Sequence, residues 1–452
     1  DVDASDAIGS ISGEGSIDIA DSVTLTAGVL NSNTTFAGVI SGLGGFTKVG
    51  SGTTTFSGTN LYTGDTTISA GTFQVTGALA DTALSVSSGA TYDVDASDAI
   101  GSISGEGSIE IAASKTLTAG DSSNTSFSGV ISGAGGGFTK AGSGTTTFSG
   151  ANTYTGATNI FAGVLEISGA ANSDSAIAVS SGADLKFNTS GNQSYSNEIS
   201  GSGSLTKAGS GTTTLSGTNT YTGATTISAG TFKVTGLLAD TTALSVSGGA
   251  TYDVDASDAI GSISGAGSID LGSGITLTAG DSSNTSFSGV MSGAGGFTKV
   301  GSGTTTFSGT NLYTGDTTIS AGTFQVTGAL ADTALSVSSG ATYDVDASDA
   351  IGSISGEGSI DIADSVTLTA GVLNSNTTFA GVISGLGGFT KVGSGTTTFS
   401  GTNLYTGDTT ISAGTFQVTG ALADTALSVS SGATYDVDAS DAIGSISGEG
   451  SI

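Results

Sequence analysis

Residues 45–75 read GFTKVGSGTTTFSGTNLYTGDTTISAGTFQV. Within this stretch apolar and polar residues alternate in short runs, for example Thr72-Phe73-Gln74-Val75. Alternation with a period of two, in residues rich in Thr, Val, Ile, Phe and Tyr, predicts β-strands, and the clusters of Gly, Asn, Ser and Asp between the runs predict turns. No stretch keeps the period of an amphipathic helix, so we expect an all-β protein with no significant helix.

The same stretch recurs along the chain, and its lysine sets the phase of the repeat. The lysine of each copy lies at Lys48, Lys140, Lys207, Lys299 and Lys391. Successive lysines are therefore 92, 67, 92 and 92 residues apart. Residues 1–109 also reappear unchanged as residues 344–452, a shift of 343 residues. The chain is thus an array with a unit of 92 residues, one copy shortened to 67 and a super-repeat of 343.

These lengths favour a β-solenoid. A barrel, sandwich or propeller must close with a fixed number of strands or blades, whereas a solenoid adds coils without any closure condition. If one coil takes about 23 residues, the 92-residue unit contains four coils and the 67-residue copy about three. We interpret the short copy as the loss of one coil, and we expect about 20 coils in the 452 residues.

We treat residues 1–452 as one continuous β-solenoid fragment of a longer array. The chain begins and ends with the motif DVDASDAIGSISGEGSI, so any signal, anchor or cap is expected beyond these residues. The expected divisions are a partial unit at 1–43, four-coil units at 44–135, 203–294 and 295–386, a three-coil unit at 136–202 and a partial unit at 387–452.

The alternation also predicts which side chains fill the interior of each coil, because neighbours along a strand point to opposite faces. The residues expected to point inward are Phe73, Val75, Leu84, Val86, Tyr92 and Val94. The residues expected to point to solvent are Thr72, Gln74, Ser85, Asp93 and Asp95. A single coil has too little core to be stable alone, so stability must come from stacking many coils.

The composition limits the possible functions. The chain carries 38 acidic residues against 8 lysines and no arginine, for a net charge of −30, which argues against nucleic acid or an anionic membrane as partner. There is no histidine and no cysteine, so the commonest general base, thiolate metal sites and disulfides are excluded. No run approaches 18 apolar residues, so we expect no membrane insertion by a helix in this fragment.

The recurring stretch resembles the passenger-associated repeat of autotransporter proteins. The positions that carry the resemblance are Phe46, Lys48, Gly50, Gly52, Phe56, Gly58, Asn60, Tyr62, Gly64, Thr66, Ile68, Gly71 and Phe73, and a further copy matches at Lys207, Asn219, Tyr221 and Gly223. This resemblance covers roughly a third of each unit. It implies a right-handed parallel β-helix that is exported across a Gram-negative outer membrane and then displayed or shed. Within the motif we expect structural roles for Lys48, Asn60, Tyr62 and Gly64, with the lysine ammonium meeting a carboxylate or a carbonyl.

The best candidate for a binding site is the motif Asp93-Val94-Asp95-Ala96-Ser97-Asp98. Its three carboxylates, with their counterparts Asp253, Asp255 and Asp258, offer the hard oxygen ligands that Ca²⁺ prefers. However, Asp98 stands where a calcium loop has glycine, and the bidentate Glu at the twelfth position is missing. We therefore favour a strand whose outward face carries carboxylates. We expect no cofactor, and Ca²⁺ remains the alternative.

Other chemistry has less support. A Ser or Thr nucleophile would need a base, and the acids recur in every unit although an active site normally occurs once, so we expect no enzyme. Thr53 and Thr55 form the Thr-x-Thr pattern that ice-binding solenoids carry in every coil, but here it occurs once per unit. The ordinary β-propensity of threonine on an exposed face is the simpler explanation.

We therefore expect an extracellular structural repeat protein that forms an elongated stalk, fibre or filament at the bacterial surface. Two alternatives stay open. The chain could belong to an adhesin passenger whose binding tip lies outside these residues, or it could be a subunit of a laterally assembling sheath or filament, with or without Ca²⁺ bridges. The expected partners are the protein itself or a host or neighbour-cell surface, and the expected location is the outer cell surface of a Gram-negative bacterium.

Overall fold

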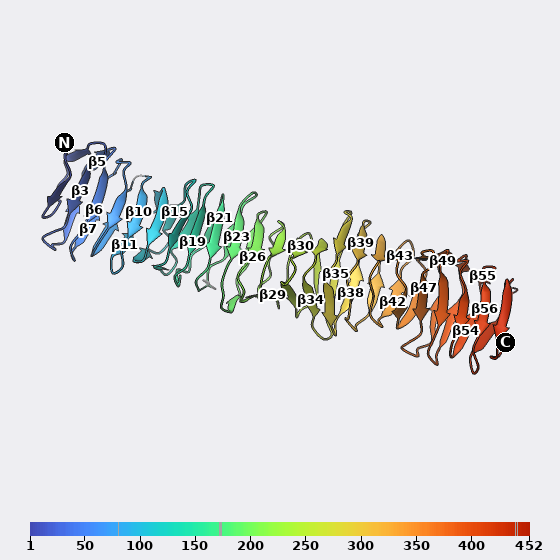
Figure 1. Ribbon diagram of the computed structural model, residues 1–452. Helices are drawn as coiled ribbons and strands as arrows, with labels where there is room; N and C mark the ends of the chain where they lie inside the picture. The colour runs from blue at the N-terminus through green and yellow to red at the C-terminus, as the bar shows by residue number, and fades with distance from the viewer. Residues whose placement is uncertain (80, 171–173, 439, 441) are drawn as a thin grey trace. The chain divides into compact units, whose positions relative to one another are not determined.

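A computed structural model describes residues 1–79, 81–170, 174–438, 440 and 442–452. The described chain forms short β-strands, numbered β1 to β58, and it contains no helix (Figure 1). A strand typically has three or four residues and pairs in parallel with strands one coil earlier and one coil later. This arrangement is a parallel β-solenoid, and it confirms the predicted fold class. Across the described ranges there is also no helix of the length and apolarity needed to cross a membrane.

Contacts divide the chain into two compact units, Asp1–Thr225 and Thr226–Ile452. In the first unit most of the strands lie on three sheets, and the chain passes from one sheet to the next as it winds. The first sheet includes β6 (Gly45–Lys48), β8 (Thr66–Ile68), β10 (Ala83–Val86), β13 (Ser102–Gly105) and β16 (Thr125–Phe127). The second sheet consists of β4 (Thr34–Phe36), β7 (Thr53–Phe56), β9 (Thr72–Val75), β11 (Thr91–Val94), β14 (Ser108–Ile111) and β17 (Val130–Ser132). The third sheet consists of β12 (Asp98–Ile100), β15 (Thr116–Ala119), β18 (Gly137–Lys140), β20 (Thr158–Ile160), β22 (Ile177–Val179) and β25 (Ile199–Gly201).

The second unit repeats this plan. One of its sheets includes β39 (Thr304–Phe307), β41 (Thr323–Val326), β43 (Thr342–Val345), β46 (Ser359–Ile362) and β49 (Val382–Gly385). Another includes β38 (Gly296–Lys299), β40 (Thr317–Ile319), β42 (Ala334–Val337), β45 (Ser353–Gly356) and β48 (Thr377–Phe379). A third includes β44 (Asp349–Ile351), β47 (Thr367–Ala370), β50 (Gly388–Lys391), β53 (Thr409–Ile411), β56 (Ala426–Val429) and β58 (Ser445–Gly448).

The register between strands gives the length of each coil. The step is 17 residues between Thr91 and Ser108, 19 between Leu84 and Ile103, 21 between Phe127 and Phe148, and 23 between Ser16 and Val39. The predicted 23 residues per coil is therefore at the long end of the range.

The four-coil interpretation of the 92-residue unit needs correction. From β6 the chain makes four turns of the first sheet, through β8, β10 and β13 to β16, and then passes β17 before it reaches β18. The strand β18 carries the next copy of Gly-Phe-Thr-Lys, but it lies on the third sheet. The unit therefore takes four and two-thirds turns, and the same motif moves to another sheet in the next unit.

The shortened copy is corrected in the same way. Three turns of the third sheet lead from β18 to β25, and the next motif strand, β26 (Ser204–Lys207), pairs with β23 (Asp184–Phe187) on the first sheet. The 67 residues thus take three and one-third turns. The short copy lacks one and one-third turns rather than one whole coil. In the second unit, the passage from β38 through β48 and β49 to β50 again takes four and two-thirds turns.

Inward-facing side chains form one core along each unit. The six predicted core residues, Phe73, Val75, Leu84, Val86, Tyr92 and Val94, are all at most 1% exposed. Aromatic rings of successive coils contact one another, with centroids 4.7 Å apart for Phe56 and Phe73 and 6.1 Å apart for Phe73 and Tyr92. Full burial of such a side chain contributes about 1.5–3 kcal/mol, so the stacked rings join neighbouring coils energetically as well as geometrically.

Glycines are required where coils approach closely at the turns. Gly322, in the turn before β41, has a φ of 66°, and a Cβ placed there would lie 2.4 Å from the carbonyl oxygen of Gly301 on the previous coil. A left-handed backbone and a neighbour at that distance both exclude a side chain.

Candidate functional site

The recurring lysine is buried, and its ammonium is held by backbone carbonyl oxygens. Lys48 is 1% exposed, and its Nζ donates hydrogen bonds to the carbonyl oxygens of Val49 (2.8 Å), Gly50 (2.8 Å) and Ala70 (3.0 Å). Ala70 belongs to the next coil, so the lysine joins two turns of the solenoid. A lysine ammonium has three N–H donors, and all three are used here.

Three other copies keep this arrangement, and the remaining copy, Lys207, also donates to a backbone carbonyl oxygen. Lys299 donates to the carbonyl oxygens of Val300 (2.7 Å), Gly301 (3.0 Å) and Ala321 (3.1 Å). The corresponding acceptors are Ala141, Gly142 and Ala162 for Lys140, Gly209 for Lys207, and Val392, Gly393 and Ala413 for Lys391. Burial lowers the pKa of Lys48 and Lys391, because desolvation disfavours the charged form. We predicted that the ammonium of the motif lysine would meet a carboxylate or a carbonyl oxygen. The structure shows that it meets carbonyl oxygens.

The tyrosine of the motif begins a buried chain of hydroxyl groups. The hydroxyl of Tyr62 lies 2.7 Å from Thr66 Oγ1, which lies 3.2 Å from Thr82 Oγ1, and Thr82 donates to the carbonyl oxygen of Gly64 at 2.5 Å. Burial raises the pKa of Tyr62, so its hydroxyl stays protonated. The same chain recurs with Tyr313, Thr317 and Thr333, and it links consecutive coils through hydrogen bonds.

The asparagine of the motif also contacts two coils. Asn60 is 1% exposed, and its Nδ2 donates to the carbonyl oxygens of Gly58 (3.3 Å) and of Ala78 on the next coil (3.0 Å). Asn311 and Asn403 repeat both contacts. The predicted structural residues Lys48, Asn60 and Tyr62 thus all point inward. Gly64 passes close to the previous coil, since a Cβ there would lie 2.5 Å from the carbonyl oxygen of Gly44.

The structure separates the three carboxylates of the calcium candidate. Asp98 is 6% exposed, and it accepts hydrogen bonds from Tyr92 Oη (2.5 Å) and from the backbone N of Leu79 on the previous coil (3.0 Å). Asp93 and Asp95 lie on the outer side instead, where both accept from Gln74 Nε2, at 3.1 and 2.7 Å. Among the residues that the structure describes, no group of three or more acidic side chains is placed to hold a metal ion.

The counterpart carboxylates are separated in the same manner. Asp258 is 7% exposed and accepts from the backbone N of Leu238, while Asp253 and Asp255 form ion pairs with Lys233, the former at 2.9 Å. Lys233 takes the place that Gln74 has in the first unit. Burial raises the pKa of Asp258 and of Asp349 to about 6, and in each case an acidic neighbour, Asp240 or Asp332, adds to this effect.

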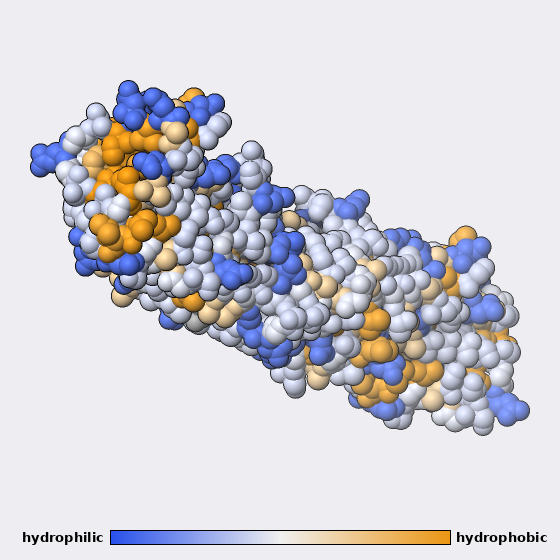
Figure 2. Space-filling view, turned by 60° about the vertical axis from the view of Figure 1, so that its left-hand side comes forward, coloured by the Kyte–Doolittle hydropathy of each residue, from blue (hydrophilic) through white to orange (hydrophobic). Residues whose placement is uncertain are grey.

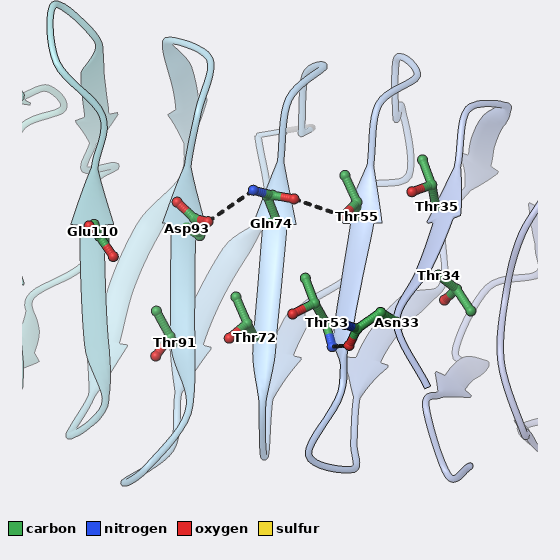
Figure 3. A pocket seen from close by; sticks show the side chains of 10 residues that line it. All are labelled: Asn33, Thr34, Thr35, Thr53, Thr55, Thr72, Gln74, Thr91, Asp93 and Glu110. Atoms are coloured by element: carbon green, nitrogen blue, oxygen red, sulfur yellow. Dashed lines mark hydrogen bonds between the residues drawn. The ribbon is translucent and has the colours of Figure 1, made fainter. Parts of the chain in front are cut away.

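The outer face of the second sheet carries a shallow polar groove (Figure 3). Two in-register rows of side chains line it, because every second residue of each strand points outward. One row runs through Thr53, Thr72 and Thr91, and the other through Thr55, Gln74, Asp93 and Glu110. Thr55 Oγ1 donates to Gln74 Oε1 at 2.8 Å, and Gln74 continues the chain to Asp93. The Thr-x-Thr pair of β7 thus has no Thr-x-Thr pair beside it on β9 or β11.

Sequence reasoning missed several of these partners. Thr82, which closes the hydroxyl chain, and Leu79, whose backbone N binds Asp98, both lie in an irregular segment between strands. A possible signal was the regular distance from each motif tyrosine to a later threonine, since Tyr62 and Thr82, like Tyr313 and Thr333, are 20 residues apart. This distance is close to one coil.

Comparison with known proteins identifies the repeat. Five segments match the family model of the passenger-associated-transport-repeat, at residues 46–75, 138–167, 205–234, 297–326 and 389–418. These are the five copies found in the sequence, so the predicted resemblance is confirmed. The repeats and the β-solenoid fold fit the passenger of an autotransporter, which is a secreted or surface-exposed protein. No curated protein and no solved structure matches the chain in the two other comparisons.

Proposed function

From the five passenger-associated-transport repeats of this chain, we propose that it is an extracellular structural protein, a stalk or fibre whose repeats supply length. One observation carries the proposal. In the motif, the lysine, the asparagine and the tyrosine–threonine chain all bind neighbouring coils, as Lys48 does with Ala70 and Asn60 with Ala78. A segment whose polar groups are committed to stacking coils is suited to extending an array. We expect no catalytic role and no resident cofactor.

Electron microscopy of chains with different numbers of repeats tests this proposal. Chains with one, two and three copies of residues 45–136 should give single particles whose long dimension grows in proportion to the number of coils, by about 4.8 Å per coil. A long dimension that does not increase with copy number would contradict a spacer function. The micrographs also separate a stalk from an assembly, because single thin particles favour the former and ordered bundles or tubes the latter.

The exposed apolar side chains favour lateral assembly as a second candidate. Leu43, Leu61, Leu386 and Leu404 are 56–62% exposed, and they come from identical copies of the unit. Figure 2 shows the apolar surface as separate patches among hydrophilic side chains. If these patches pack against a second copy, a variant with all four leucines changed to serine should stay monomeric at concentrations where the parent chain forms bundles. An adhesin passenger is the other alternative, and its binding tip would lie beyond this array.

A further inference from the structure

Two corresponding places in the second unit form shallow grooves that share an inner leucine and two aspartates, and each has an exposed leucine from a different position of the repeat. The first groove is lined by Leu312, Leu330, Asp332 and Asp349, together with small residues such as Ala331. The second is lined by Leu237, Leu238, Asp240 and Asp258. Leu330 and Asp332 correspond in the repeat to Leu238 and Asp240, and Asp349 corresponds to Asp258. We call these two places the leucine–aspartate grooves.

Each leucine–aspartate groove has one exposed apolar wall. Leu312 is 58% exposed and Leu237 is 44% exposed, whereas Leu330 and Leu238 below them are 3% exposed. The residues between these side chains include Ala329, Ala331 and Ala350 in the first groove, and their small size leaves the leucines accessible. An apolar side chain of a partner could therefore lie against Leu312 or Leu237.

The acidic side of each groove has no cation of its own. Asp332 and Asp240 are exposed at the rim, and Asp349 and Asp258 are 7% exposed below them. The ion pairs in the described part of the chain join Lys186 and Lys233 to acids elsewhere, so none reaches these four carboxylates. The two acids of a groove repel each other, since Asp332 raises the pKa of Asp349 and Asp240 raises that of Asp258. A cation at the rim would remove this repulsion.

We propose that the leucine–aspartate grooves bind lysine- or arginine-bearing segments of a basic partner protein. The aliphatic stem of the partner's side chain lies along Leu312 or Leu237, and its charged head meets Asp332 or Asp240. A side chain with a long apolar stem and a cationic head matches both halves of the groove, which neither a simple cation nor a neutral apolar segment does. The net charge of −30 attracts such a partner over a longer range. This binding site is independent of whether the array acts as a stalk or as an assembly.

Fluorescence anisotropy with a defined probe tests the proposal. The probe is a labelled peptide of alternating glycine and lysine, titrated with the intact 452-residue chain at about 0.15 M salt, where screening suppresses distant charges. A second probe replaces each lysine with diaminobutyric acid, which has the same charge on a shorter stem. We expect the lysine peptide to bind at least threefold more tightly than the short-stem peptide. Equal affinity would overturn the part that we assign to the leucine wall.

Two fourfold variants locate the binding. The groove variant changes to Asn the rim carboxylates Asp240 and Asp332 and their counterparts in the other copies, Asp81 and Asp424, and the control variant combines Glu357→Gln with Asp65→Asn, Asp316→Asn and Asp408→Asn. Both variants change the net charge equally, and all eight residues are exposed, so neither should disturb folding. We expect the groove variant to raise the Kd of the lysine peptide by about three- to tenfold and the control variant to leave it within about twofold. An equal loss in both would show that binding follows net charge alone and would overturn the proposal.

Discussion

At the scale of single residues, the buried motif lysine can be tested through its three hydrogen bonds to carbonyl oxygens. In Lys299→Met the stem can still pack, but the carbonyl oxygens of Val300, Gly301 and Ala321 lose their donor. Hydrogen bonds to charged groups contribute about 1.5–3 kcal/mol, and buried acceptors without donors add to the loss. We expect the free energy of local opening at the amides of β40 and β41 to fall by about 2–4 kcal/mol. Hydrogen exchange with mass spectrometry measures this free energy.

The chain supplies its own control for the lysine variant. Lys233 is an outward lysine, and the first unit has Gln74 in its place. Lys233→Gln removes the same charge from the surface and creates a side chain that the repeat already accommodates. Exposed ion pairs contribute about 0.2–1 kcal/mol, so exchange of β29 (Thr231–Val234) should change little. Equal effects of the two variants would refute a special role for the carbonyl-bound ammonium.

The buried aspartates make a residue-scale prediction about pH. The pKa of Asp258 and Asp349 is about 6 in the folded chain, above the ordinary value of 3.8, because burial disfavours the carboxylate. A raised folded pKa means that the stabilising contribution is fully present below about pH 4 and is lost as the pH rises through 6. From pH 5 to pH 7.5 the second unit should therefore lose about 1.4 kcal/mol for each of these groups.

Asparagine variants separate this effect from general acid repulsion. In Asp258→Asn with Asp349→Asn the amide keeps an acceptor for the backbone N of Leu238 and of Leu330. We expect the urea midpoint of this variant to exceed that of the parent chain at pH 7.5 and to match it within error at pH 3, where the carboxyls are protonated in both states. The idea fails if both chains lose stability in parallel over that interval.

At the scale of turns and strands, two glycines can be compared to measure how much stability is lost when a side chain is added where two coils lie close together. Gly322 and Gly340 both have left-handed backbones, with φ of 66° and 81°, but a Cβ at Gly340 meets nothing within 4 Å. Gly340→Ala should cost only the backbone strain of about 1–2 kcal/mol. Gly322→Ala must also displace the carbonyl of Gly301, so we expect a loss at least twice as large, measured as a shift of the urea midpoint. Comparable losses would mean that the coils can separate freely at this turn.

The element scale also shows why strands were predicted well and coils less well. Alternation identifies inward residues such as Phe73 and Tyr92, because burial follows directly from a period of two. It does not record which of the three sheets a strand joins, since each sheet presents the same apolar interior to its strands. Nothing in the motif around Lys48 or Lys140 therefore required a whole number of turns per unit, and β6 and β18 lie on different sheets.

The positions of the three acids in the calcium candidate could not be predicted for a related reason. Spacing along the chain placed Asp93, Asp95 and Asp98 close together, but the chain turns a corner between β11 and β12, so Asp98 points inward. Its partners come from Tyr92 on its own coil and from Leu79 on the previous coil. A contact between coils depends on the register, which the local sequence does not specify.

At the scale of the whole molecule, the placement of the lysines predicts how the folded chain resists trypsin. The chain has 8 basic residues, all lysine, and the five motif lysines are at most 1% exposed. The remaining sites are Lys115, in the turn between β14 and β15, and Lys186 and Lys233, which lie within strands. Trypsin needs an extended, accessible backbone, so a turn is cut before a paired strand. We expect the first cleavage after Lys115, giving fragments of residues 1–115 and 116–452.

The motif lysines should be cut only when their coils open. Opening that costs about 3 kcal/mol or more reduces the cleavable population by on the order of 10²-fold, so sites such as Lys48 and Lys299 should persist long after Lys115 is cut. Mass spectrometry of a time course, with the urea-unfolded chain as control, distinguishes the two classes of site. Early cleavage after Lys48 or Lys299 in the folded chain would mean that the carbonyl-bound lysines do not hold their coils together, and the structural role proposed for the repeat would then lose its main support.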